Sequence, residues 1–229
     1  MKTKRELADF GTLTQAEQQI VDEIDSGQDI KLGNGTLPPE TAGGDRKVNA
    51  DFIRYLAIGG CKECKTHEKG LRIFGALIEG ALDLEGCNLG RDLALINCRF
   101  PEQPVFQSTT LDNLFLNGSR LHKGLSADRL EAKGGVFLQN VKAKGEVRML
   151  GAALGGDLDC DGAKFSNSDG KALVLSGVNI AGVFFWQDGA EVKGELDLSA
   201  ATVGLLHDDP ACWPKAHGDL VLDRFRYGA

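Results

Sequence analysis

One segment of the sequence has a spacing that metal sites use. Cys61 and Cys64 form a C-x-x-C motif, and His67 follows three residues later. Two thiolates and an imidazole supply three of the four ligands of a tetrahedral zinc site, although a fourth ligand is missing nearby. The segment is either a structural zinc site or a polar linker with two reduced thiols. A redox role would need a βαβ context, which the flanking sequence does not have.

Other candidates for chemistry are weaker. The glycine-rich segments 33–35 and 151–156 do not open a helix after a strand, so the dinucleotide fingerprint fails. His207 and His217 lie with acidic residues in segment 205–217, which could hold a metal or could be a solvated loop. We expect no catalytic residues and no cofactor other than the possible zinc.

A repeat organises the chain from Leu71 to Tyr227. Its clearest copies begin at Gly80, Gly156, Gly194 and Gly218, and most units are eleven residues long. Apolar residues stand at positions 1, 3, 6 and 8. Because alternate strand residues face opposite sides, positions 1 and 3 form one short strand with inward side chains, and positions 6 and 8 form another. Two units then make a four-sided coil of about 22 residues.

The repeat predicts an all-β fold, a right-handed quadrilateral β-helix over residues 71–229, with a small N-terminal α-helical cap and linker over residues 1–70. A capping box at Thr14 and Glu17 predicts a helix over 14–26, and an apolar stripe predicts a second over 49–58. The first coil of a solenoid has an unpaired strand edge that something must cover. The two predicted helices are the candidates for covering this edge.

The alternation of small and large inward residues resembles, loosely, the pentapeptide-repeat proteins. A closer resemblance rests on LTQAEQQIVDEI, ADFIRYLAIGG, THEKGLRIFGALIEGALDLEGCNL, LALINCRF and GDLVLDRFRYG. These phrases are similar to an uncharacterised bacterial β-helix family often labelled "membrane-associated oxidoreductase". The resemblance implies the β-helix fold. The label would imply a redox or membrane-associated enzyme component, with no mechanism attached to particular residues.

Residues at equal positions in alternate units stack into ladders along the solenoid. At outward positions this register predicts an exposed aromatic ladder with Phe115, Phe137, Phe184 and Trp186. It also predicts a cationic ladder, supported by His122 and Lys144, whose members are Arg99, Arg120, Lys142 and Lys164. A contiguous apolar patch on a soluble protein is typical of an interface, unless another segment of the chain covers it. A run of charge is either a solvated face or a site for an anionic partner.

These surfaces predict a non-enzymatic interaction protein that binds another macromolecule through one side of the solenoid. A net charge of -7 makes a protein partner, such as a nucleic-acid-handling enzyme, a better expectation than nucleic acid itself. The strand pair 220–227 has an open edge, which predicts a homodimer or a further C-terminal segment. The sequence shows neither a signal peptide nor a transmembrane segment, so we expect a cytoplasmic protein.

Overall fold

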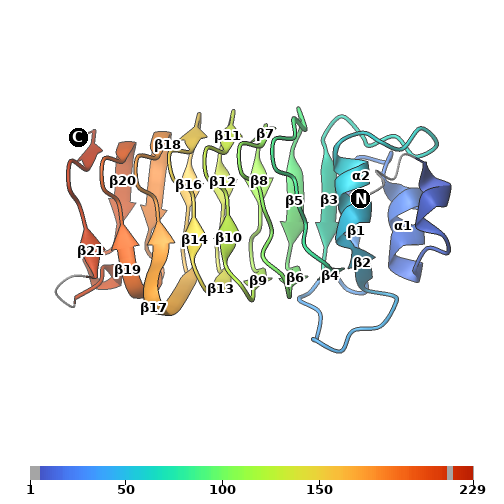
Figure 1. Cartoon of the computed structure of the whole chain (residues 1–229), viewed down its shortest axis with the longest axis horizontal. Helices are drawn as coiled ribbons and strands as arrows, with labels where there is room; N and C mark the ends of the chain where they lie inside the picture. Colours follow the sequence, from blue (N-terminus) through green and yellow to red (C-terminus); the bar gives the residue numbers. More distant parts are fainter. Residues whose placement is uncertain (1–5, 216–218, 229) are drawn as a thin grey trace.

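The computed structural model is a parallel β-solenoid of about seven turns that carries two short α-helices at its N-terminal end (Figure 1). It describes residues 6–215 and 219–228. The predicted β-helix with a helical N-terminal cap is confirmed. No helix of the described residues is long and apolar enough to cross a bilayer.

Strand pairing defines four faces, which the chain visits in the same order in every coil. Face 1 holds β1 (Ile30–Lys31), β3 (Leu71–Phe74), β5 (Leu93–Ile96), β8 (Leu114–Phe115), β12 (Val136–Phe137) and β16 (Leu158–Asp159). Face 2 holds β2 (Lys47–Asn49), β4 (Leu77–Glu79), β6 (Arg99–Phe100), β9 (Arg120–Leu121) and β13 (Lys142–Lys144). Face 3 holds β10 (Leu125–Ser126), β14 (Val147–Arg148) and β21 (Leu220–Val221). Face 4 holds β7 (Thr110–Leu111), β11 (Glu131–Ala132), β15 (Ala153–Leu154) and β22 (Arg226–Tyr227).

Four longer strands near the C-terminal end turn a corner and serve two faces each. They are β17 (Lys164–Val174) and β19 (Glu191–Asp197), which run from face 2 to face 3, and β18 (Asn179–Trp186) and β20 (Thr202–Asp208), which run from face 4 to face 1. Pairing therefore continues around these corners, and the last coils are joined more extensively than the earlier ones.

The core is a column of stacked inward side chains. On face 1 it contains six residues that are at most 2% exposed: Leu71, Leu93, Leu114, Val136, Leu158 and Phe184. Smaller residues, such as Cys98 and Ala163, are buried immediately before the strands of face 2. A narrow coil has no room for two large side chains on facing walls, so the alternation of sizes that appears in the sequence fills the column.

The corner between faces 1 and 2 needs a left-handed backbone conformation in successive coils. Its residues have φ between 51° and 69° and are Asn97, Gly118, Asn140, Gly162 and Asp188. Glycine adopts this region without a steric penalty, and Asn and Asp tolerate it better than other residues.

The N-terminal cap is built on two helices, α1 (Gln15–Glu23) and α2 (Ala50–Ala57), with a short 3-10 turn, η1 (Leu7–Phe10), before them. Both helices lie within the predicted ranges. The cap is continuous with the sheets, because Ile30 in β1 pairs with Ile73 and Val48 in β2 pairs with Ile78. The segment between the two helices thus contains the first strand of face 1.

The register prediction for Phe184 and Trp186 is wrong. Both were expected to face solvent, yet both are 0% exposed. Phe184 pairs with Leu158 and takes the inward position, and Phe185 faces out. Residues 183–186 are all apolar, so the sequence fits either register. In the structure the repeat length of eleven residues is kept, because Phe184 follows the inward Leu173 by eleven positions. A slip of one residue exchanges the inward and outward sets.

The end of the chain also differs from the predicted register. Alternate eleven-residue units would place Leu220 on the same side as Phe115 and Phe137, whereas it pairs with Leu196 on face 3. The segment 205–217 was expected as a loop, whereas residues 205–208 belong to β20 on face 1. A second 3-10 turn, η2 (Pro210–Cys212), follows, and Trp213 packs against Trp186 with a ring-centroid distance of 5.9 Å. His217 lies outside the described residues.

Candidate partner-binding surface

An aromatic pair stands at the centre of face 1. Phe115 in β8 and Phe137 in β12 are register partners, and their rings are stacked with centroids 4.6 Å apart and planes 8° from parallel. Both side chains point outward, since the residues that flank each of them in the chain are buried, and both rings remain half-buried. One apolar face of each ring is covered by the other ring.

Two further rings on face 1 were missed by the sequence-based register. Phe185 takes the outward position that was assigned to Phe184, and it pairs with His207 of β20. The two ring centroids are 5.5 Å apart in an edge-on arrangement. Once Phe184 is placed inward, the same alternation puts Phe185 and His207 outward, so the eleven-residue step could have found them.

A carboxylate separates the Phe115/Phe137 pair from Phe185. Asp159 pairs with Phe137 on one side and Phe185 on the other, and only 7% of it is exposed. One oxygen accepts a hydrogen bond from Asp161 N at 3.0 Å, and the other accepts one from Gln139. Burial raises the pKa of Asp159, and the nearby charges of Asp161 and Asp157 raise it further, against those two hydrogen bonds.

This raised pKa has a consequence for stability. The ionised Asp159 carboxylate opposes folding, so its protonated form stabilises the fold below the carboxyl's unfolded pKa, and this contribution is lost as pH rises through the folded pKa. We expect Asp159→Asn to change the pH dependence of thermal stability. The difference in melting temperature, variant minus parent, should increase as the pH rises through the acidic range toward neutrality. Parallel profiles for variant and parent in thermal unfolding from pH 4 to 7 would contradict this.

The predicted cationic ladder exists on face 2. Register pairs join Arg99 to Arg120, Arg120 to Lys142, and Lys142 to Lys164, with Glu191 after Lys164. Its two ends are neutralised. Arg99 lies 3.2 Å from a Glu40 carboxylate oxygen, and Lys164 lies 3.4 Å from a Glu191 oxygen.

The middle of the ladder is different. Arg120 donates to three main-chain carbonyls, those of Gly118, Ser119 and Asn140. Lys142 and Lys144 are exposed on β13. Burial lowers the pKa of Arg120, and the charge of Arg99 lowers it further. Closely spaced like charges in this region therefore disfavour one another's charged forms.

His122 reports the same electrostatic field. It follows β9, in register with Lys144, and its Nε2 accepts a hydrogen bond from Arg99 Nη1 at 2.9 Å. Burial lowers the pKa of His122, and Arg99 and Lys144 lower it further while Glu40 opposes them. The imidazole is therefore held neutral beside the cations and acts as a hydrogen-bond acceptor.

The two ladders lie on neighbouring faces, which corrects the expectation of a single side. Phe115 and Arg120 are separated by the corner residues 116–119, and Phe137 and Lys142 by 138–141. The corner between them carries an amide row in which Asn117 Nδ2 donates to Gln139 Oε1. A partner that reaches the aromatic pair and the cations must therefore wrap this polar corner.

The predicted zinc ligands are not arranged as a metal site. Cys61 and Cys64 form a disulfide and are each 5% exposed. The His67 imidazole accepts from Lys69 N through Nδ1 at 3.1 Å. Within residues 6–215 and 219–228, no group of three or more His, Cys, Asp or Glu side chains could hold a metal ion. The expectation of two reduced thiols differs from the structure as well.

The core thiols are structural. Cys98 and Cys160 are both 0% exposed. Burial raises the pKa of Cys98 to about 12 and that of Cys160 well above its ordinary value. The thiolate is the nucleophilic form of cysteine, so neither side chain is reactive near neutral pH.

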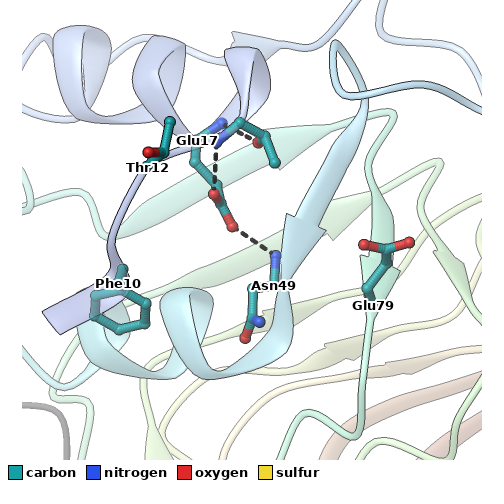
Figure 2. Close-up of a pocket in the computed structure, with 6 residues that line it drawn as sticks. Phe10, Thr12, Glu17, Asn49 and Glu79 are labelled. Carbon is teal, nitrogen blue, oxygen red and sulfur yellow. Dashed lines mark hydrogen bonds between the residues drawn. The ribbon is translucent and has the colours of Figure 1, made fainter.

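A small polar pocket of about 190 Å³ lies where the cap meets the first coil (Figure 2). It contains two carboxylates, and both are already used. Glu17, 5% exposed, accepts from Thr14 N and from Asn49 N, each at 2.9 Å, and Glu79 forms an ion pair with Lys47 at 2.7 Å. Glu17 thereby joins the start of α1 to the end of β2, which is a structural role.

The chain was compared with protein-family models, curated proteins and solved structures, and nothing matched in any of the three. The resemblance to the β-helix family described above and to the pentapeptide-repeat proteins stays a prediction.

Proposed function

We propose that this solenoid is a non-enzymatic binding protein that holds a macromolecular partner over the edge shared by faces 1 and 2. The observation that carries the proposal is the half-exposed Phe115/Phe137 pair beside the cations Arg120, Lys142 and Lys144. Aromatic side chains and arginine are enriched at protein interfaces, where buried aromatics supply much of the affinity. A redox or membrane-associated enzyme component remains the alternative.

A protein partner fits the aromatic pair better than nucleic acid does. Single-stranded nucleic acid binds aromatic residues by stacking bases on exposed ring faces. Phe115 and Phe137 already stack on each other, so one face of each ring is not available to a base, and the edges of both rings remain. Ring edges suit aliphatic and aromatic side chains of a protein, which need contact area without a parallel stacking geometry.

A second copy of the chain is one possible protein partner, so a homodimer is part of the proposal. The last coil supports it. Three large apolar residues of the described chain are exposed on this coil: Leu205, Leu222 and Tyr227, at 50%, 44% and 60%. Exposed apolar side chains gathered on one part of a surface favour association.

The aromatic pair can be tested with amide substitutions. Phe115→Gln together with Phe137→Gln should fold, because Asn117 and Gln139 already stack as amides on the same face. The double variant should lose partner capture from a lysate of the source organism, at a cost in affinity of about tenfold or more. Light scattering on the same samples gives the oligomeric state.

Ile58→Gln is the control, since Ile58 is an exposed apolar side chain at the end of α2, away from the pair and from the last coil. The control should leave capture unchanged. Equal capture by the parent and the Phe115/Phe137 double variant would contradict the proposed surface. A monomer in the parent would contradict the homodimer and leave the rest of the proposal in place.

A further inference from the structure

The middle of face 2 is an uncompensated positive cluster, defined here as Arg120, Lys142 and Lys144. Within the described part of the chain, no carboxylate lies within 4.0 Å of any of the three. Elsewhere on the ladder each cation has such a carboxylate, Glu40 for Arg99 and Glu191 for Lys164. The cluster is therefore the place on this face where an added negative charge gains most.

The chain itself shows how an acidic segment binds beside the cluster. The loop between β1 and β2 passes along the solenoid next to β4, at the bottom of Figure 1. Arg99 Nε donates to Pro38 O at 3.0 Å, and Arg99 Nη1 lies 3.2 Å from Glu40 Oε1. The same carboxylate oxygen is 3.9 Å from His122 Nε2. A single arginine thus takes a main-chain carbonyl and a carboxylate from one Pro-Pro-Glu segment.

We infer that an extended acidic segment of a partner protein binds along face 2 and places its carboxylates on the positive cluster, as Glu40 does on Arg99. The inference rests on the proposed binding function and specifies its partner. A polypeptide offers both main-chain carbonyls and side-chain carboxylates, the two kinds of group that Arg99 binds. Nucleic acid offers phosphates, and it is repelled at long range by a chain of net charge -7.

The spacing of the coils favours a particular kind of segment. Successive coils are about 4.8 Å apart, so alternate coils are about 9.6 Å apart. A polyproline II segment rises about 3.1 Å per residue, and three residues therefore advance it by about 9.3 Å. A segment with a carboxylate at every third residue would match every second rung of the ladder. Arg99 and Lys142 are two rungs apart, so a segment with one carboxylate on Lys142 of the cluster would bring its next carboxylate to Arg99, where it would compete with Glu40.

The test is a titration of the whole chain with a fluorescent peptide of four Pro-Pro-Glu repeats, followed by anisotropy. The parent should bind this peptide more tightly than four Pro-Pro-Gln repeats or an oligothymidylate of equal length, and binding should weaken as salt rises. Lys142→Glu with Lys144→Glu should weaken it about tenfold, because two favourable contacts become repulsive. Glu40→Gln should strengthen it about twofold to threefold by releasing Arg99.

The matched control reverses two exposed lysines of the cap linker, Lys62→Glu with Lys65→Glu, and should change the affinity by less than about twofold. Equal losses from both double variants would show an effect of net charge alone and would overturn the inference. Tighter binding of the oligothymidylate would overturn it in favour of nucleic acid. If the peptide fails to bind while the Phe115/Phe137 variant still loses partner capture, the acidic segment is wrong and the binding function stands.

Discussion

Phe184→Gln should unfold the C-terminal coils, whereas Phe185→Gln should leave the fold intact. Phe184 is 0% exposed and lies 5.8 Å from Trp186, centroid to centroid, inside the column. Removing a buried phenyl ring costs about 3–5 kcal/mol, and burying an amide without partners adds about 1–3 kcal/mol. The sum is comparable to the entire stability of many domains, about 5–15 kcal/mol.

The two substitutions are the same chemical change at adjacent residues, so Phe185→Gln is the control for Phe184→Gln. Phe185 is half-buried and outward, beside His207. Its substitution should cost no more than about 1 kcal/mol. Urea unfolding monitored by circular dichroism measures both. Similar midpoints for the two variants, or a larger loss for Phe185→Gln, would show that the strand has the opposite register.

Most of the fold follows from the eleven-residue repeat. The repeat predicts the solenoid, the narrow core and the cationic ladder, because a parallel coil stacks equal positions directly on one another. The register pairs from Arg99 to Lys164 confirm the ladder. The prediction failed at residues 183–186, where four apolar residues in a row remove the alternation that fixes the register.

The environment of each surface residue could not be predicted in the same way. Glu40 reaches Arg99 across 59 residues of sequence through a loop that has no repeat. That contact decides which cations are neutralised and which remain available. The disulfide of Cys61 with Cys64 is likewise a matter of local geometry, since the same motif fits a zinc site, a thiol pair or a disulfide.

The cap is the part of the molecule that links the fold to the proposed surface. It pairs β1 and β2 with the first coil, and it buries Phe52, Ile53 and Leu56 of α2 completely. The loop that carries Glu40 to Arg99 starts at β1 and ends at β2. Whatever holds β2 in place therefore also holds the acidic loop on face 2.

Glu17→Ala should loosen this cap. The Glu17 carboxylate is the acceptor for Thr14 N and Asn49 N, each at 2.9 Å, and Thr14 Oγ1 in turn accepts from Glu17 N at 3.1 Å. Its loss leaves two amides without their charged acceptor, at about 1.5–3 kcal/mol each, and the neighbouring pocket lets water recover part of that (Figure 2). We expect a net loss of about 2–4 kcal/mol.

Hydrogen exchange followed by mass spectrometry should find this loss in α1, β2 and β4, with the coils beyond β9 unchanged, because solenoid coils are stabilised by their nearest neighbours. Glu17→Gln keeps one acceptor and should lose less. Glu23→Ala, on the same helix, removes only a contact with Gln19 and should exchange like the parent. If Glu17→Ala exchanged at the rates of the parent in every segment, the cap would be held by its apolar contacts alone.

Loosening of β2 should also release the loop that carries Glu40. Glu17→Ala should therefore bind the Pro-Pro-Glu peptide more tightly than Glu23→Ala does.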